Sequence, residues 1–307
     1  EEISAADGGI ANLMAANNSP VLAALREHGT AAQKRRFFPK LTTGEMIGCI
    51  ALTEPHTGSD AAAIRTRAER RGDYFVLNGH KSFITAGRRA GVVMIVAVTD
   101  PDAGKRGIST FLTPTDNPGY KVLREEAKLG HRTNDTCAIA FEDMMVPATD
   151  LLGAEGRGLG IALANLSAGR IGVAAQAVGG ARAAFEAALN YAQEREAFGK
   201  PIIEHQAVAF RLADMATKIE VGRQMYLHAA QIHDSGAPSL KEASMAKLFA
   251  SDMAETVASD ALQTFGGYGY LEDFPVAKIL RDVRVYRIYE GTNDIQKIVI
   301  SRALASS

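Results

Sequence analysis

The acidic residue Glu290 lies in the segment Tyr289–Asp294, after the apolar residues of 279–288 and before a predicted helix. Apolar surroundings exclude water from a carboxylate, which raises its pKa and suits it to act as a general base. The same acid would also be stabilised by the N-terminus of the following helix, for which Thr292 or Asn293 is the expected cap. The residues alone leave both interpretations open.

A second group of candidates lies at two strand ends. In the segment Leu52–Asp60, the hydroxyls of Thr53 and Ser59 are suited to bonding a polar ring or a phosphate, or to closing ST-turns and Asx-turns with their own backbone. In the segment 82–87, Thr85 offers another hydroxyl, and Phe83 is expected in the core.

A third group flanks a helix end. Arg195 is suited to a forked contact with a pyrophosphate, Phe198 to stacking and Gln206 to bonding a heterocycle, whereas Arg195 would also favour the helix dipole. His205 is interpreted as a capping or solvated residue rather than a base.

Two glycine-rich segments complete the candidates. Gly266–Gly267 allows a ligand to approach the backbone, or caps a helix. Gly156–Gly160 lacks the preceding strand of a dinucleotide-binding loop and is interpreted as a lead-in to a helix.

The elements that must position these residues change in type along the chain. Short helical patterns extend to about residue 41, and β-prone runs separated by turn residues follow between residues 46 and 141. The predicted strands are 47–52, 74–77, 92–98, 110–112 and 138–141. Because no long helices alternate with these runs, an antiparallel sheet or barrel is predicted. Long Ala-rich helices with short joints then predict an up-and-down four-helix bundle. These helices are predicted at 161–194, 205–234, 240–265 and 293–305.

The predicted fold is therefore α+β: an all-α N-terminal remnant (1–45), a middle antiparallel β domain (46–150) and a C-terminal four-helix bundle (151–307). Small residues on more than one helix face are compatible with helix-mediated oligomerisation and equally with a tightly packed internal bundle.

Composition excludes several classes of protein. The chain has 307 residues, 47% hydrophobic and 22% charged, which is typical of a globular protein. A net charge of −1 provides no positive field for nucleic acid. The two cysteines, Cys49 and Cys137, indicate neither a disulfide framework nor a zinc site, no metal is expected, and a reducing, cytoplasmic setting fits best. No apolar run long enough to cross a membrane is recognised.

Taken together, the candidate segments resemble signatures of the acyl-CoA dehydrogenase flavoprotein family, in the same order and spacing over nearly the whole chain. The segments are Leu52–Pro55 with Gly58–Asp60, Phe83–Thr85, Arg195 with Phe198–Gly199, His205–Gln206, Gln263 with Phe265–Gly269, and Tyr289–Thr292.

The resemblance implies an enzyme that uses flavin adenine dinucleotide (FAD) to desaturate acyl-CoA thioesters, with Glu290 removing the α proton as a hydride leaves the β carbon for the flavin. It assigns twelve positions to FAD: Leu52, Thr53, Phe83, Thr85, Arg195, Phe198, His205, Gln206, Gln263, Gly267, Thr292 and Asp294. It assigns six positions to the acyl-CoA: Ser59, Thr99, Ser167, Arg170, Tyr289 and Gly291.

The resemblance also implies a homo-oligomer, a tetramer or dimer, because several FAD contacts come from a neighbouring subunit. An electron-transferring flavoprotein is the expected acceptor, in the cytoplasm or, in a eukaryote, the mitochondrial matrix. An acyl-CoA oxidase and a non-catalytic alkylation-response flavoprotein are the alternatives.

The sequence departs from the family pattern in a few places. Ser167 stands where an acid is common, Phe83 replaces a frequent Trp, and Asp294 replaces Gln or Glu. Position 169, which carries the base in some members, is Gly, so Glu290 is the one candidate base. The family's first helices are expected to precede Glu1.

Overall fold

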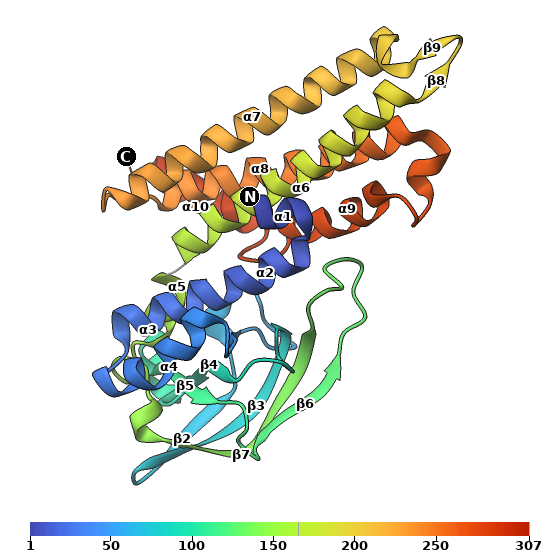
Figure 1. The fold of residues 1–307 in the computed structure, drawn as a ribbon. Helices are drawn as coiled ribbons and strands as arrows, with labels where there is room; N and C mark the ends of the chain where they lie inside the picture. The colour runs from blue at the N-terminus through green and yellow to red at the C-terminus, as the bar shows by residue number, and fades with distance from the viewer. Residues whose placement is uncertain (165, 307) are drawn as a thin grey trace. The chain divides into compact units, whose positions relative to one another are not determined.

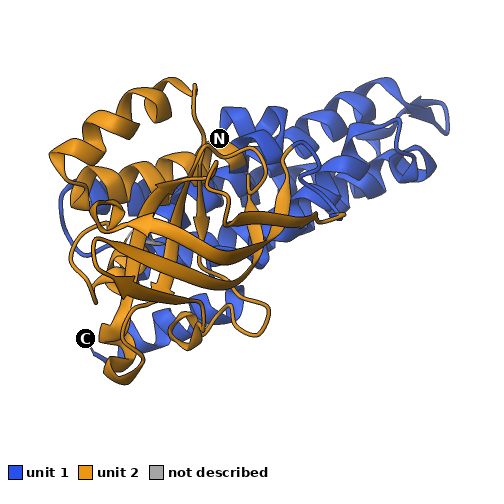
Figure 2. Ribbon diagram, turned by 90° about the horizontal axis from the view of Figure 1, so that it is seen from below, with its two compact units in different colours: residues 1–12, 128–133, 167–307 blue, residues 13–127, 134–166 orange. Residues whose placement is uncertain are grey.

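The structure of the chain is a computed structural model that describes residues 1–164 and 166–306, without the side chain of Leu166. The chain forms two compact units, each assembled from separated stretches (Figure 2). The helical unit comprises Glu1–Asn12, Lys128–Thr133 and Ser167–Ser307, and the sheet unit comprises Leu13–Ala127 and Asn134–Leu166. The predicted domain boundaries near residues 45 and 150 stay predictions.

The helical unit is dominated by long helices (Figure 1). The helices predicted at 240–265 and 293–305 are confirmed with those bounds, and the helix predicted at 205–234 begins one residue later than predicted, at Gln206. A further helix, α9, was not predicted. The helices are α6 (Leu166–Glu194), α7 (Gln206–Asp234), α8 (Leu240–Phe265), α9 (Pro275–Val283) and α10 (Asn293–Ala305).

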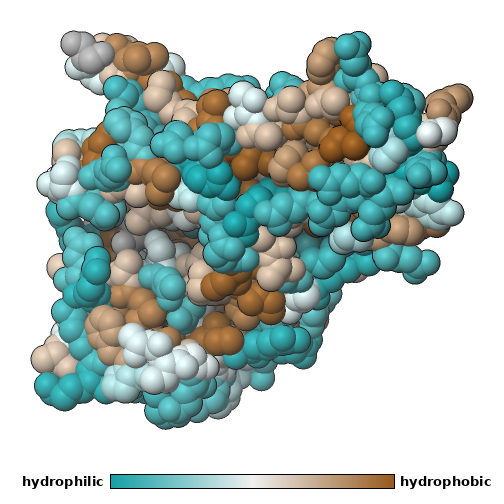
Figure 3. All heavy atoms as spheres, turned by 45° about the horizontal axis from the view of Figure 1, so that its top comes forward, coloured by the Kyte–Doolittle hydropathy of each residue, from teal (hydrophilic) through white to brown (hydrophobic). Residues whose placement is uncertain are grey.

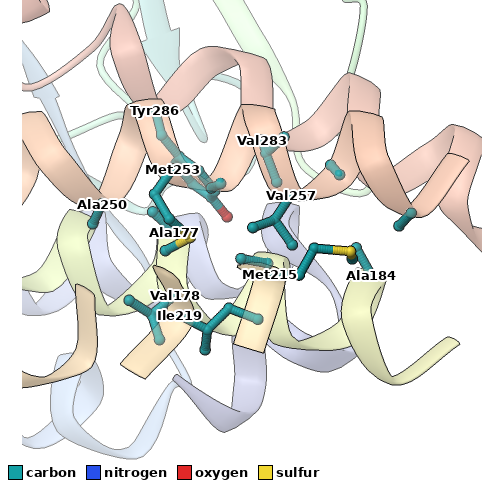
Figure 4. Packing of buried hydrophobic residues seen from close by; sticks show 14 of the residues in the cluster. Ala177, Val178, Ala184, Met215, Ile219, Ala250, Met253, Val257, Val283 and Tyr286 are labelled. Carbon is teal, nitrogen blue, oxygen red and sulfur yellow. The ribbon is translucent and has the colours of Figure 1, made fainter. Parts of the chain in front are cut away.

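The bundle packs through small side chains (Figure 4). Ala177 on α6 and Ala250 on α8 are fully buried, which allows the helix backbones to approach closely. Met215 on α7 and Met253 on α8 fill the space between them. Truncating either methionine to alanine would cost about 2–5 kcal/mol, because the cavity would not fully collapse.

The sheet unit contains a seven-stranded sheet in the order β1-β4-β2-β3-β7-β6, with β5 paired to β4. All five predicted strands are found. The strand at 92–98 has the predicted bounds, and the one predicted at 47–52 is shorter, at 48–51. The strands predicted at 74–77, 110–112 and 138–141 are each longer than predicted. The strands are β1 (Gly48–Ala51), β2 (Arg67–Arg71), β3 (Tyr74–Thr85), β4 (Val92–Val98), β5 (Ile108–Pro114), β6 (Tyr120–Glu125) and β7 (Thr136–Pro147).

The sheet is not purely antiparallel, which corrects the prediction. β4 pairs parallel with β1, aligning Val92 with Gly48, and parallel with β2, aligning Val98 with Arg67. Its sequence explains this central position, because residues 92–97 are all buried, as parallel strands covered on both faces require. β2 and β6 were missed because charged residues interrupt their hydrophobic alternation.

The N-terminal segment is more helical than the predicted pair of remnants. At the start of α4 (Ala31–Thr43), the Thr30 hydroxyl accepts from Gln33 N–H while the Gln33 side chain accepts from Thr30 N–H, and Gly44 ends the helix at φ +76°. The other helices are α1 (Glu2–Ala6), α2 (Gly8–Ala16), α3 (Ala23–His28) and, before α6, α5 (Gly158–Ala164). The predicted helix from Ile161 onward is described as α5 and α6, and Asn165 lies outside the described residues.

One described stretch, Gly158–Glu194 apart from Asn165, is long and apolar enough to cross a membrane, with a mean hydropathy of 1.3 in its most apolar window. This differs from the sequence-based expectation. However, 44% of that window is buried inside the protein, and the core helix of a bundle satisfies the same criteria. The visible surface in Figure 3 mixes hydrophobic and hydrophilic residues.

Candidate active site

The Glu290 segment connects a short 3₁₀ turn, Arg284–Arg287, to α10 in the helical unit. Glu290 and Gly291 both adopt left-handed backbone conformations, with φ +54° and +85°. This conformation is rare for a residue with a side chain, so surrounding contacts must hold it. The Thr292 hydroxyl accepts from Ile295 N–H at 3.3 Å and caps α10, which confirms that interpretation of Thr292.

The Glu290 carboxylate is enclosed although the residue as a whole is only half-buried. Its Oε2 is shielded from solvent and has no hydrogen-bond partner among the described residues. Burial raises the pKa of Glu290 to about 7, although the charges of Arg170 and Lys247 act in the opposite direction. The predicted rise is therefore confirmed. At neutral pH this carboxylate is poised to accept a proton.

Position 169 lies directly beside this carboxylate. A Cβ atom built on Gly169 would lie 3.1 Å from Glu290 Oε1 and 3.2 Å from Oε2. The glycine therefore leaves the space that the glutamate occupies.

Arg170 and Lys247 bring two buried positive charges to the same loop. Arg170 is 4% exposed, and its Nη1 donates to Ser244 Oγ at 3.0 Å. Lys247 is 0% exposed, and burial, reinforced by the charge of Arg170, lowers its pKa to about 8. Of these two cations, only Arg170 was predicted from the sequence.

The other acyl-CoA candidates of the helical unit differ in their surroundings. The Tyr289 hydroxyl donates to Gln176 Oε1 at 3.3 Å, and burial holds the pKa of Tyr289 well above its usual value. Ser167 is half-buried at the beginning of α6, three residues before Arg170. Ser167, Arg170, Tyr289 and Gly291 therefore belong to the same unit as Glu290.

A second cluster in the helical unit surrounds a cavity of about 440 Å³. Arg195 and Gly267, both assigned to FAD by the resemblance, line it together, and the Arg195 guanidinium lies 5.9 Å from the centroid of the Tyr268 ring. The remaining lining residues are Tyr191, Ile202, Thr264, Phe265, Gly266 and Leu271.

The other predicted FAD residues of the helical unit do not line this cavity. The hairpin of β8 (Glu196–Ala197) and β9 (Lys200–Pro201) presents Phe198 at its tip, 97% exposed and at φ +55°. His205 precedes α7, and its Nε2 lies 3.0 Å from Ala197 O, so it is neither a side-chain cap nor freely solvated. Gln206, Gln263 and Asp294 are exposed, and Asp294 pairs with Lys297 at 3.7 Å.

The sheet unit holds the remaining FAD candidates. Thr53 O accepts from Ser82 N–H at 2.9 Å, which brings Leu52–Thr53 beside the segment that contains Phe83 and Thr85. Phe83 is 67% exposed at φ +60°, so its expected core position is wrong. The pairing of β3 with β7 is irregular between Lys81 and Ile84, and this irregularity turns Phe83 outward.

The two acyl-CoA candidates of the sheet unit are not alike. Ser59 is exposed in the loop after β1, where the hydroxyl of Thr57, and not of Ser59, donates to Asp60 O at 2.6 Å. The Thr99 hydroxyl lies 2.7 Å from Ser109 Oγ and donates to Gly107 O, so it is engaged within its own sheet.

Sequence reasoning missed the buried polar residues that support these segments. Lys247 donates to Gly291 O, and Gln296 donates to Glu290 O and Gly291 O. In the sheet unit, Lys81 pairs with Glu54 at 2.8 Å. A signal for Lys247 was present, because Ser244, Lys247 and Ser251 recur at helical spacing on the Ala-rich face of α8. Among the described residues, no group of three or more His, Cys, Asp or Glu side chains is arranged to hold a metal ion.

Comparisons with known proteins agree with this arrangement. Family models of acyl-CoA dehydrogenases match residues 1–45 (N-terminal domain), 49–144 (middle domain) and 156–305 (C-terminal domain). An acyl-CoA dehydrogenase of Bacillus subtilis is 49% identical over 276 residues, which are 90% of this chain and 73% of that protein. The mitochondrial short-chain specific acyl-CoA dehydrogenase of Bos taurus is 43% identical over 307 residues, which are 100% of this chain and 74% of that protein.

A solved structure shows the same fold. Butyryl-CoA dehydrogenase from Megasphaera elsdenii superposes with a TM-score of 0.97 at 41% identity, covering 99% of this chain and 80% of that one. The chain therefore belongs to the acyl-CoA dehydrogenase family, whose members are FAD-dependent flavoprotein oxidoreductases.

Proposed function

We propose that this chain catalyses the α,β-dehydrogenation of an acyl-CoA thioester, with Glu290 as the base that removes the α proton. The observation that supports this most directly is an enclosed carboxylate whose Oε2 has no partner among the described residues and whose pKa is raised to about 7. A paired or solvated glutamate would remain ionised but too weakly basic for this step.

The residues present fit FAD. A Cβ atom built on Gly266 or Gly267 would meet nothing within 4 Å, so the backbone beside Arg195 is open to a ligand. The exposed Arg195 guanidinium, which forms no ion pair with a described carboxylate, suits a pyrophosphate. In the sheet unit, the outward Phe83 ring and the hydroxyls of Thr53 and Thr85 suit a flat heterocycle with polar edges.

The chain's own residues would divide the remaining work. The α proton of a thioester is a weak acid, so the thioester oxygen must receive hydrogen bonds as negative charge develops. The resemblance assigns one of these bonds to the backbone N–H of Glu290. When bound, FAD supplies the acceptor for the hydride that leaves the β carbon.

We propose a short-chain thioester as the preferred substrate, because the Bos taurus relative is named as short-chain specific and the Megasphaera elsdenii structure as a butyryl-CoA dehydrogenase. The proposed contacts with the acyl-CoA are Ser59, Thr99, Ser167, Arg170, Tyr289 and Gly291.

Family members are oligomeric, and we propose a homotetramer for this chain. Large apolar side chains of the helical unit support this, because Phe198, Phe210 and Tyr270 are 97%, 67% and 85% exposed in the single chain. We also propose an electron-transferring flavoprotein as acceptor and a cytoplasmic or mitochondrial-matrix location.

Anaerobic mixing of the FAD-loaded protein with butyryl-CoA, octanoyl-CoA and palmitoyl-CoA tests the proposal. The visible flavin band is expected to bleach fastest with butyryl-CoA. Glu290→Gln is expected to slow bleaching at least about a hundredfold while FAD stays bound. Unchanged bleaching in this variant would remove the base assignment, and rapid peroxide formation after admission of oxygen would favour an oxidase.

A further inference from the structure

The backbone of the Glu290 loop has a conformation that needs contacts from surrounding residues to be stable. Glu290 and the following Gly291 are both left-handed, at φ +54° and +85°. The direction of the Glu290 side chain depends on this backbone, because a change to the right-handed region would swing its Cα–Cβ bond away. A base in such a position needs external support.

Two buried side chains from different helices supply that support. Gln296 of α10 directs its Nε2 to Gly291 O at 2.8 Å and to Glu290 O at 3.2 Å. Lys247 of α8 directs its Nζ to Gly291 O at 2.9 Å. Both side chains are fully buried, so water cannot easily replace these bonds.

A second layer of contacts fixes Lys247 itself. Its Nζ also donates to Asn293 Oδ1 at 2.9 Å, and Asn293 Nδ2 donates to Asp252 Oδ1 at 2.8 Å. Ser251 Oγ donates to the same Asn293 oxygen at 3.1 Å. A buried ammonium is costly without such partners, so its retention here requires a reason beyond packing.

We propose that Lys247 and Gln296 are positioning residues for the base, which clamp the carbonyls of Glu290 and Gly291 and thereby hold the Glu290 carboxylate in its reactive orientation. The term "clamp" refers below to these two side chains. The inference rests on the proposed role of Glu290. Neither clamp residue contacts the substrate in this account, and each acts through the loop.

The test compares clamp variants with variants of neighbouring polar residues. Lys247→Met and Gln296→Leu each remove donors to the loop. Thr256→Ala removes a side-chain bond to Asp252 O within α8 that is separate from the loop and its supports, and Lys278→Met removes a cation that pairs with Asp7 and Asp282 in the same unit. Each variant is loaded with FAD and mixed anaerobically with increasing concentrations of butyryl-CoA.

We expect each clamp variant to lower the limiting rate of flavin bleaching at least about tenfold, because a bond to a charged donor or a strained loop is worth roughly that factor. The thioester concentration that gives half the limiting rate should change less than about twofold, since only the base is displaced. The double variant should lose less than the product of the two single effects, because both bonds hold one loop. Both control variants should remain within about twofold of the parent.

Equal losses of limiting rate and of thioester affinity, or limiting rates like the parent's in both clamp variants, would overturn the proposal. If Lys247→Met fails to fold, the uncharged Gln296→Leu decides. Amide hydrogen exchange of the segment 288–292 gives an independent result, with faster exchange expected in the clamp variants and not in Thr256→Ala. If hydrogen exchange is unchanged in the clamp variants, the clamp is overturned, even where no thioester bleaches the flavin of the parent protein. If a thioester bleaches the flavin of the parent and of the clamp variants at the same rate, the clamp is overturned but the proposed function of Glu290 is not.

Discussion

Two glutamates with enclosed carboxylates, one in each unit, show how opposite environments shift the pKa of one residue type in opposite directions. Glu54 of the sheet unit accepts hydrogen bonds from Lys81 Nζ at 2.8 Å, Arg65 N–H at 2.7 Å and Thr66 N–H at 3.0 Å. Burial pushes its pKa up, but the charge of Lys81 and these bonds outweigh burial and lower it. Glu290 of the helical unit has an unpartnered Oε2 and a raised pKa. Burial alone therefore does not raise the pKa of a glutamate, whereas burial of a carboxylate without hydrogen-bond partners does.

The same substitution at both positions should have opposite consequences. Glu54→Gln leaves Lys81, which is 0% exposed, without its counter-charge, and we expect a loss of about 3 kcal/mol in the free energy of unfolding. Glu290→Gln should cost clearly less stability, because its Oε2 loses no bond to a described residue. Urea unfolding of both variants measures the difference.

A smaller loss at Glu54 than at Glu290 would contradict this comparison. Glu69→Gln is a suitable control, because Glu69 forms an exposed ion pair with Arg71 and should change stability by less than about 1 kcal/mol.

The two glutamates should also affect the protein at different pH values, Glu290 through flavin bleaching and Glu54 through stability. Glu290 must be ionised to accept a proton, so bleaching at low thioester concentration should rise with pH to a plateau above about 7 and fall about tenfold per pH unit below it. Glu54 has the opposite sign of shift, so its contribution to stability is present above its unfolded pKa of 4.5 and lost as pH falls below that value. Between about pH 4.5 and 7 the protein should therefore be folded, but flavin bleaching should be slow.

Stopped-flow bleaching between about pH 5 and 8.5 and circular dichroism between about pH 3 and 8.5 follow the two processes separately. If bleaching and folding are lost together, or if bleaching is constant down to pH 5, the raised pKa of Glu290 does not control the reaction.

The sequence predicted long elements better than irregular ones. α8 and α10 were predicted with correct bounds, because helical periodicity runs uninterrupted to Gly266 in α8 and begins after Thr292 in α10. Phe83 was placed wrongly because residue type favours the core, whereas its exposure follows from irregular pairing of β3 with β7. The parallel pairing of β1 with β4 was also missed, since it joins segments 44 residues apart that no local pattern connects.

The candidate site was predicted unevenly for the same reason. The raised pKa of Glu290 followed from its apolar neighbours in sequence. The supports of the loop could not be derived in this way, because Lys247 and Glu290 are brought together only by the packing of α8 against the loop. A lysine within a helix is normally expected to be exposed, and only the folded structure shows that Lys247 is buried.

Position 169 offers the finest test of the difference between the two carboxylates. Gly169→Ala would place a Cβ atom 3.1 Å from Glu290 Oε1, which is closer than ordinary van der Waals contact, so the carboxylate must move by a few tenths of an ångström. We expect the limiting bleaching rate to fall by about threefold to tenfold, since general-base catalysis depends on position. Gly172→Ala on the same helix is the matched control, because its Cβ would meet nothing within 4 Å. Both substitutions favour the helix by about 1 kcal/mol, so stability cannot account for a difference in rate. Equal rates in the two variants would mean that the Glu290 carboxylate has room to adjust, and the enclosed position of its unpartnered Oε2, which distinguishes it from Glu54, would then be less restrictive than its geometry indicates.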